Sequence, residues 1–446
     1  MSRLRERFAS VLTWRLWLTP GMGVKRHVLV AVWGALLLVA GVIGGVLWLL
    51  NGRRGVLSSP IEHVLVSGTW RHAGGYLSLL VALLGVLFAV LAVGRLNRSL
   101  LSNWMPSPGK AAVVLHRRVS LARGPRMVAL GGGSGLSNLL RGLREHTSNV
   151  TAVVTVSDDG GSSGRLRIAF DMPPPGDLTD CLAALSDNEL EVSRLMQYRF
   201  ARGEELEGHT FGNLLIATLT EVEGDFGQAI RVFNRMLNLS GAVYPVTTCP
   251  VTLTVTKASG EIIKGESRTR ECPGPARSVA LEPASPVAVP EVLDAIRRAD
   301  LAVLGPGSLF TSTLAPVVVP AVRGALLESE ALIVQVCNIM TEAGETDGFD
   351  AFDHAEALTR HLGRRPDVVV LNSTPVDEPR LAAYRAEGAE VVAPALERFQ
   401  AAGLHVAQLP LLGGGQLAQH DSDRLASWLS RLARDHVTAR KAGLRA

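Results

Sequence analysis

Two long uncharged apolar runs near the N-terminus limit the possible folds more than any other feature of this sequence. They span residues 28–50 and 74–94, which are 23 and 21 residues long. A helix of about 20 apolar residues is long enough to cross the hydrocarbon core of a bilayer. Trp33, Trp48 and Trp70 lie within or beside the runs, and such rings favour the membrane interface. We therefore predict two transmembrane helices rather than a cleaved signal peptide, whose apolar region would be shorter.

Basic residues gather around these runs and predict their orientation. Residues 1–126 contain 16 of the 45 Lys and Arg residues but only 2 of the 41 Asp and Glu residues. The 23-residue connection between the runs contributes only Arg53, Arg54 and Arg71 to this positive charge. Because basic flanks stay on the cytoplasmic side, we predict a hairpin with both ends in the cytoplasm. The lipid bilayer is thus one expected partner, and a cytoplasmic domain would be anchored to the cell membrane.

The rest of the chain predicts an acidic globular body. We divide the chain into a membrane anchor at 1–106, a linker at 107–126 and a globular domain at 127–446. Acidic residues outnumber basic ones in that domain, whereas a nucleic-acid-binding protein needs a basic surface. We therefore expect no nucleic-acid partner. The four cysteines form no CxxC pair, which indicates reduced thiols rather than a zinc site or a disulfide framework.

The globular domain has the pattern of an α/β fold. Short apolar segments alternate with helical patterns, as in a Rossmann-like, mostly parallel sheet covered on both faces. The predicted strands are 127–130, 150–156, 301–304, 332–337 and 368–371. Residues 243–282 break the alternation, because their period of two around a Ser-Gly turn predicts a small antiparallel β insertion. A last helix is predicted near residues 422–432.

Four polar, glycine-rich loops follow predicted strands. They begin at Gly131 (GGGSG), Ser157 (SDDGGSSGRLR), Gly305 (GPGSLFTS) and Asn338 (NIMTEAGET). Ligands of an open parallel sheet bind beyond the carboxyl ends of its strands. We therefore expect the four loops to form one site.

The first loop predicts an anion-binding turn. Its residues are Gly131, Gly132, Gly133, Ser134 and Gly135. The glycines allow a sharp turn that directs N–H groups at an anion beside a helix N-terminus. The loop matches neither G-x-G-x-x-G nor the P-loop, because Leu136 stands where a third glycine would fall and no lysine follows. We expect it to hold phosphate groups of a ligand that is neither a typical dinucleotide nor ATP.

The other loops and nearby motifs add polar candidates. Asp158 and Asp159 end the second predicted strand and are candidates for catalysis, for binding a hydroxyl or for holding Mg²⁺. Arg165 offers a cation to a phosphate, and we expect Asp177 to cap a helix. The remaining candidate ligand-binding residues are His209, Asn213, Gly305, Gly307, Ser308, Thr311 and Asn338.

These motifs resemble those of the gluconeogenesis factor family, relatives of the CofD-like 2-phospho-L-lactate transferases. The resemblance rests on six motifs in the same order: GGGSGLSNLLRGL, TVSDDGGSSGRLR, PPGDLTDCLAAL, GHTFGNLLIATL, LGPGSLFTS and VCNIMTEAGET. It extends from about residue 127 to the C-terminus and leaves out the membrane hairpin.

The resemblance implies a Rossmann-like domain that binds a UDP-sugar, such as UDP-N-acetylglucosamine, without catalytic turnover. It also implies a role in growth on gluconeogenic carbon sources, in cell shape and in envelope synthesis. Envelope-synthesis proteins and further copies of the chain are the protein partners considered. The alternative is a Mg²⁺-dependent phospholactyl-type transferase acting on a nucleotide-activated donor, with Asp158 and Asp159 serving the metal or the acceptor. The regulator needs no cofactor, and only the transferase would use Mg²⁺.

Overall fold

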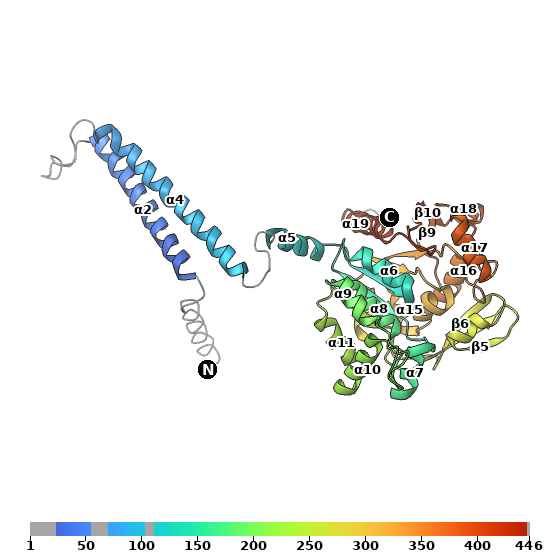
Figure 1. Cartoon of the computed structure of the whole chain (residues 1–446). Coiled ribbons are helices and arrows are strands. Elements are labelled where there is room, and N and C mark those ends of the chain that lie inside the picture. The colour runs from blue at the N-terminus through green and yellow to red at the C-terminus, as the bar shows by residue number, and fades with distance from the viewer. Residues whose placement is uncertain (1–23, 55–69, 103–110, 444–446) are drawn as a thin grey trace. The chain divides into compact units, whose positions relative to one another are not determined.

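The structure is a computed structural model that describes residues 24–54, 70–102 and 111–443. It divides into two compact units, Met1–Arg117 and Arg118–Ala446, which are described separately below (Figure 1). The basic N-terminal tail, most of the connection between the apolar runs and the first residues of the predicted linker lie outside the described residues.

The first unit contains two long helices, α2 (Val24–Arg54) and α4 (Trp70–Ser102). Within them, Arg26–Leu50 and Ala73–Leu96 are long and apolar enough to cross a membrane. The two helices pack closely along small residues, since a Cβ atom added at Gly41 would lie 2.8 Å from the Cα atom of Ala82. Close approach at small residues is typical of helix pairs in bilayers.

A bent helix pair in the second unit, Leu309–Val317 and Pro320–Glu328, also passes this test of length and composition. Most of its residues, among them Phe310 and Leu326, are buried in the core of that unit. Burial inside the α/β core explains their apolar character.

A seven-stranded sheet forms the centre of the second unit. Its strand order is β10-β9-β8-β7-β1-β2-β3, and each neighbouring pair is parallel. The strands are β1 (Met127–Gly131), β2 (Val150–Val154), β3 (Ala242–Pro245), β7 (Leu301–Leu304), β8 (Leu332–Val336), β9 (Val368–Asn372) and β10 (His405–Leu409). The five predicted strands and the mostly parallel sheet are confirmed, while the edge strands β3 and β10 were not predicted as such.

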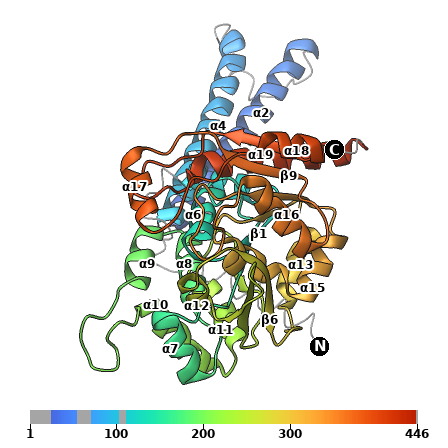
Figure 2. The same ribbon diagram turned by 90° about the vertical axis from the view of Figure 1, so that its right-hand side faces the viewer.

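Helices cover both faces of this sheet. Figure 2 shows α6 (Gly133–Leu143) and α8 (Gly176–Leu185) on one side of β1, with α13 (Pro290–Arg298) and α15 (Pro320–Glu328) on the other. The predicted last helix is present as α19 (Ser422–Lys441) and packs against α6. The leucines of α6 recur at helical spacing and are all buried, which attaches this helix to the sheet: Leu136, Leu139, Leu140 and Leu143.

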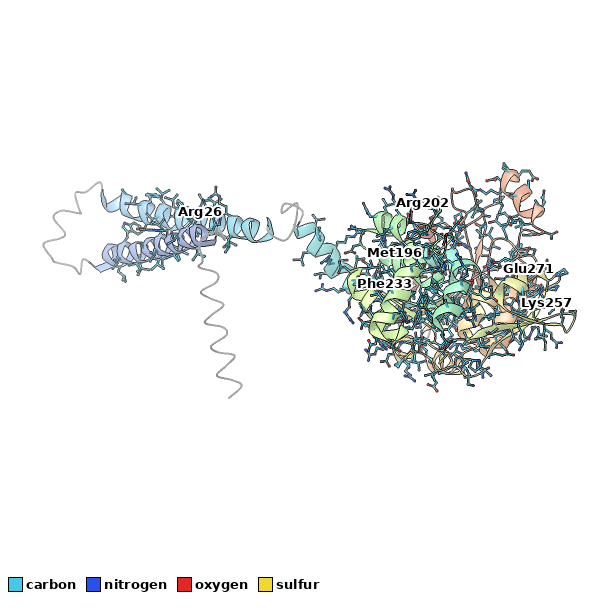
Figure 3. All side chains as sticks on the ribbon, turned by 60° about the horizontal axis from the view of Figure 1, so that its bottom comes forward. Arg26, Met196, Arg202, Phe233, Lys257 and Glu271 are labelled. Carbon is cyan, nitrogen blue, oxygen red and sulfur yellow. The ribbon has the colours of Figure 1, made fainter. Side chains whose placement is uncertain are left out.

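Further helices complete the described part of the chain. They are α5 (Ala111–Ala122), α7 (Gly161–Phe170), α9 (Glu189–Met196), α10 (Phe211–Glu223), α11 (Phe226–Met236), the π-helix η2 (Leu309–Thr313), α14 (Leu314–Val317), α16 (Ala351–Leu362), α17 (Glu378–Ala386) and α18 (Leu396–Ala402). Phe233 of α11 is fully buried among them (Figure 3).

A second, antiparallel sheet has the order β5-β4-β6, with β4 (Thr252–Lys257), β5 (Ile262–Lys264) and β6 (Ala276–Glu282). The short helix α12 (Glu266–Glu271) follows β5. The predicted β insertion is present, but the start predicted at residue 243 is wrong. That residue belongs to β3, which pairs with β2 of the large sheet, so the small sheet begins only at Thr252.

Candidate functional site

A cavity of about 480 Å³ lies at the carboxyl edge of the large sheet. The loops after β2, β1, β7 and β8 all contribute to its lining, in the order in which these strands lie in the sheet. The predicted residues that line it are Gly132, Gly133, Ser134, Gly135, Asp158, Gly307, Ser308 and Asn338. The four loops therefore lie together around one cavity, as we expected from the sequence.

The glycine turn after β1 leads directly into α6. Gly133 has a φ of +60° and is the first residue of the helix, a conformation that side-chain-bearing residues rarely adopt. The first N–H groups of a helix have no acceptor within the helix. The carboxyl group of Asp177 lies against this turn, because a Cβ atom added at Gly132 would collide with Asp177 Oδ2. The N–H groups of Ser134 and Gly135 lie in the first turn of α6. The N-terminus of a helix is suited to binding an anion.

The loop after β7 approaches this turn closely. A Cβ atom added at Gly135 would lie 2.5 Å from the carbonyl oxygen of Pro306, so only glycine fits there. A buried carboxylate fixes the start of η2, because Glu345 Oε1 accepts the N–H groups of Phe310 (2.5 Å) and Thr311 (2.9 Å). Thr311 is itself fully buried and does not line the cavity.

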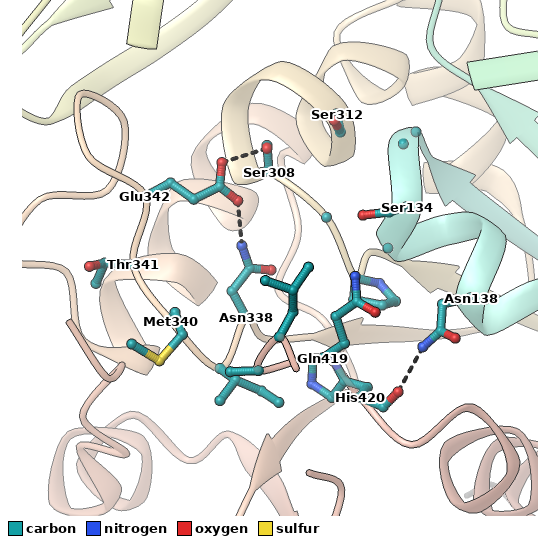
Figure 4. A pocket seen from close by; sticks show the side chains of 18 of the residues that line it. Ser134, Asn138, Ser308, Ser312, Asn338, Met340, Thr341, Glu342, Gln419 and His420 are labelled. Atoms are coloured by element: carbon teal, nitrogen blue, oxygen red, sulfur yellow. Dashed lines mark hydrogen bonds between the residues drawn. The ribbon is translucent and has the colours of Figure 1, made fainter. Parts of the chain in front are cut away.

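Glu342 joins the loops after β7 and β8. Ser308 Oγ donates to its carboxylate at 2.5 Å and Asn338 Nδ2 donates at 3.3 Å, as the dashed lines of Figure 4 show. On the opposite wall, Asn138 Nδ2 of α6 donates to the carbonyl of His420 at 2.7 Å. These bonds fix the polar rim of the cavity.

The end of the cavity after β8 combines apolar and polar side chains. Its apolar and aromatic residues are Ile339, Met340, Tyr384, Leu417 and Ala418, and its polar residues are Asn338, Thr341, Glu342, Gln419 and His420. The hydroxyl of Tyr384 accepts the N–H of Ala418 at 3.2 Å, which holds the 417–420 segment against α17. Burial lowers the pKa of His420 to about 4, so this imidazole is neutral at physiological pH.

The opposite end, beside β2, carries charged side chains. Asp158, Asp177, Glu266 and Arg270 line it together. Burial, with the nearby Asp158 carboxylate, raises the pKa of Asp177 to about 7. Burial also raises the pKa of Glu266 to about 8, although Arg270 opposes the shift with an ion pair of 3.0 Å. Two carboxyl groups of the cavity thus titrate near neutral pH.

A buried lysine holds the helix that carries Glu266 and Arg270. The ammonium group of Lys257 donates to the carbonyls of Thr269 (3.0 Å) and Cys272 (2.8 Å), at the end of α12. It also donates to the carbonyl of Gly344, in the loop after β8. Lys257 therefore ties the small sheet to the cavity wall.

Asp159, Arg165, His209 and Asn213 do not line this cavity. Asp159 Oδ1 instead accepts the N–H and the hydroxyl of Ser267, at 2.9 and 2.7 Å. Arg165 donates to the carbonyl of Glu207 at 2.8 Å. Gly131 and Gly305 each precede a lining segment and have positive φ angles, which shape the two turns.

His209 and Asn213 belong to a buried network behind the loop after β2. Asn213 Nδ2 donates to Ser162 at 3.1 Å and to Ser163 at 3.4 Å, and His209 Nδ1 bonds to the Ser162 hydroxyl at 2.9 Å. Thr179 donates to Asn213 Oδ1. The network joins α7, α8 and α10, so these residues support the loop in this structure.

The Asp158–Asp159 pair was also considered for Mg²⁺, and its geometry can be tested. Only Asp158 faces the cavity, because Asp159 bonds to Ser267. Across the described parts of the chain, no group of three or more His, Cys, Asp or Glu residues is arranged to hold a metal ion. The pair does not fit a shared metal in this arrangement.

Several residues that line the cavity were not predicted from the sequence. Asp177 was expected to cap α8, but the N-cap is Pro175 and Asp177 lies in the first turn, facing the cavity. Glu342 could have been predicted, because it belongs to the NIMTEAGET loop, of which only Asn338 was selected as a candidate. Glu266 and Arg270 lie in the β insertion, where an alternating pattern gives no signal for a site.

Fold and site together define an α/β protein with a polar cavity at the glycine-rich carboxyl edge of a parallel sheet. Comparison with known proteins narrows this class. Residues 127–412 match the CofD family, described as 2-phospho-L-lactate transferase CofD. The gluconeogenesis factor of Bacillus subtilis is 40% identical over 313 residues, which cover 70% of this chain and 99% of that protein. The chain belongs to the CofD family, and its relatives are gluconeogenesis factors.

Two further comparisons extend the family relationship. A relative from Deinococcus radiodurans is 45% identical over 432 residues, which cover 94% of this chain and 89% of that protein. A crystal structure of protein BH3568 from Bacillus halodurans has a TM-score of 0.67 and 38% identity, and covers 69% of this chain and 99% of that chain. The Deinococcus similarity therefore extends into the N-terminal helices, whereas the Bacillus proteins match a shorter part of this chain.

Proposed function

We propose that this chain is a UDP-sugar-binding regulator of the gluconeogenesis factor type, without catalytic turnover. The observation that carries the proposal is the convergence of two glycine turns, at residues 132–135 and 305–308, on one cavity. The volume of this cavity, about 480 Å³, is in the range of small-molecule sites.

The lining offers a complementary group for each part of a nucleotide-sugar. The N-terminus of α6, with Ser134 and Gly135, suits a diphosphate. Ser308, Asn338 and the nearby amide of Gln419 are hydrogen-bonding groups for a ribose or a uracil. Tyr384 and the apolar residues around it give a nucleobase a surface to pack against.

Calorimetric titration of UDP-N-acetylglucosamine, UDP-glucose and GDP into the protein tests the proposal. We expect both UDP-sugars to bind with a stoichiometry of one per chain, and GDP to bind at least about tenfold more weakly. The absence of heat with every UDP compound, in a folded sample, would exclude the proposed ligand class.

A Mg²⁺-dependent phospholactyl-type transferase is the second candidate, supported by the family match. It predicts consumption of a nucleotide-activated donor with Mg²⁺ present. The regulator predicts binding without turnover. Chromatography of the nucleotide after incubation with Mg²⁺ and an acceptor separates the two.

The cellular role that we propose follows the family. The N-terminal hairpin anchors the domain in the cytoplasmic membrane, close to the enzymes of envelope synthesis, which are its proposed partners along with further copies of the chain. A deletion strain should then lose normal cell shape on gluconeogenic carbon sources and recover it with the intact gene. Normal morphology of the deletion strain on those sources would contradict this role.

A further inference from the structure

The cavity crosses four strand ends in a fixed order. Asp158 follows β2, Gly133 follows β1, Gly307 follows β7 and Asn338 follows β8. Neighbouring strands lie about 4.8 Å apart, so the four loops span about 14 Å along the edge of the sheet. An elongated ligand that lies across this edge contacts the loops one after another.

The middle of this path is the part suited to phosphate. Gly133 and Ser134 open α6 on the β1 side, and Gly307 and Ser308 face them from the β7 side. The close approach of Gly135 to Pro306 brings the two turns together. Helix N–H groups and a hydroxyl are available here to bind phosphate. In a nucleotide-sugar the diphosphate likewise lies in the middle, between the nucleoside and the sugar.

The two ends of the path differ in chemistry. The β8 end presents the apolar and aromatic side chains of Ile339, Met340 and Tyr384, together with the uncharged polar residues Thr341, Gln419 and His420. Glu342 also lies there, and its carboxylate accepts hydrogen bonds from Ser308 and Asn338. The β2 end presents Asp158 and the carboxyl groups described next. An apolar and aromatic surface suits a nucleobase, whereas carboxyl groups suit the hydroxyls of a sugar.

Three carboxyl groups converge at the β2 end. Asp158 and Asp177 line it from the large sheet and α8, and Glu266 lines it from α12 with a side chain that is only 13% exposed. Arg270 pairs with Glu266 and is the cation that lines this end. The end is therefore rich in hydrogen-bond acceptors and poor in compensating positive charge.

We propose that the nucleotide-sugar lies with its base at the β8 end and its sugar at the β2 end, where Asp158, Asp177 and Glu266 select a neutral sugar over a uronic acid. This inference rests on the proposed UDP-sugar function. A sugar carboxylate at this end would lie beside three carboxyl groups, and like charges in a partly buried site disfavour binding strongly.

The raised pKa values of Asp177 and Glu266 add a pH dependence to this selection. Burial raises the pKa of Glu266, Arg270 opposes this shift, and the carboxyl groups of Asp177, Asp158 and Asp159 add to it. Both groups ionise between about pH 7 and pH 8. Discrimination against the uronic acid should accordingly be stronger at pH 8.5 than at pH 6.5.

The test uses the full chain in detergent and three probes: UDP, UDP-glucose and UDP-glucuronate. The two sugars differ only at C6, where a hydroxymethyl group is replaced by a carboxylate. We expect UDP-glucose to bind at least about tenfold more tightly than UDP-glucuronate at pH 8.5, which corresponds to about 1.4 kcal/mol. Glu266→Gln should reduce this ratio at least about threefold and leave the affinity for UDP unchanged.

Glu271→Gln is the matched control. Glu271 is exposed at the end of the same helix, α12, and does not line the cavity (Figure 3). This variant removes the same charge from the same helix and should keep the wild-type ratio. Asp177→Asn provides a second cavity variant, and thermal melts verify that each variant is folded.

The outcomes separate this inference from the function on which it rests. Equal affinities for the two sugars, an unchanged ratio in both Glu266→Gln and Asp177→Asn, or a loss of UDP affinity in Glu266→Gln would each overturn the orientation while UDP-sugar binding stands. A folded protein that binds none of the three probes would overturn the proposed function, and the orientation with it.

Discussion

The carboxylate of Asp177 packs directly against the backbone of Gly132, so that a Cβ atom added at Gly132 would collide with Asp177 Oδ2. The same residue lines the cavity together with Gly133. Asp177 and the glycine turn therefore form one unit, although 45 residues of sequence separate Gly132 from Asp177.

Gly132→Ala should disturb this unit and weaken ligand binding. The added methyl group must displace Asp177, and the first turn of α6 would move with it. We expect a loss of affinity for UDP-N-acetylglucosamine of at least about tenfold, or about 1.4 kcal/mol, measured by titration calorimetry. Gly324→Ala is the control, because a Cβ atom there meets no heavy atom within 4 Å. Equal losses in the two variants would contradict the close packing.

Asp177→Asn should change how stability depends on pH. Burial raises the pKa of Asp177 to about 7 from an ordinary 3.8. A carboxyl group with a raised pKa in the folded state favours folding while it is protonated, and this contribution is lost as pH rises from about 4 to 7. The asparagine variant has no such loss. Relative to wild type, it should gain about 2 °C or more in melting temperature between pH 5 and pH 8.

Differential scanning fluorimetry across this pH range measures the effect of Asp177→Asn. Asp435→Asn, at an exposed position of α19, serves as the control and should follow the wild-type curve. A constant difference between Asp177→Asn and wild type at every pH would show that the carboxyl group is not the source.

Asn213→Ala should lower stability. The side chain is 4% exposed and bonds to Ser162, Ser163 and Thr179, which would be left without this partner. We expect a cost of about 1–3 kcal/mol in the free energy of unfolding, measured by urea denaturation. Gln228→Ala, at an exposed position of α11, should cost far less. A stable Asn213→Ala variant that binds no ligand would instead indicate a direct contact with the ligand.

The proposed membrane hairpin predicts on which side of the membrane each part of the chain lies. A reporter fused after Ala446 and one inserted between Pro60 and Ile61 should report opposite sides of the membrane, because the two candidate spans at Arg26–Leu50 and Ala73–Leu96 enclose the insertion point. Paired phosphatase and fluorescent-protein fusions measure this. Signals from the same side would mean that one of the two helices does not cross the bilayer.

The sequence predicted the interior of the fold well, because buried parallel strands are continuous apolar runs. MVALG of β1 and LAVL of β7 are wholly buried and were recognised. The missed strand β10, HVAQL, is a half-exposed edge strand whose residues are mixed in polarity. β3 was assigned to the insertion, because its alternating burial resembles that of the antiparallel strands which follow it.

The site was predictable where loops follow strands and much less so where tertiary packing brings residues to it. Gly133 and Ser308 were found because their position after a strand fixes which edge of the sheet they occupy. Glu266 reaches the cavity only because Lys257 holds α12 against the loop after β8. An aspartate in the first turn of a helix can serve the helix or a neighbouring cavity, so local sequence could not assign Asp177.

The central claim is that the glycine turn holds the diphosphate of a nucleotide-sugar, and Gly133→Val tests it most directly against Gly161→Val. Both glycines have positive φ angles, begin a helix and leave open space for a Cβ atom, but only Gly133 lines the cavity. The two variants should therefore lose similar stability. Calorimetric titration of UDP-N-acetylglucosamine should show affinity at least about tenfold weaker in Gly133→Val, or about 1.4 kcal/mol, and near wild type in Gly161→Val. Wild-type affinity in folded Gly133→Val would contradict the account.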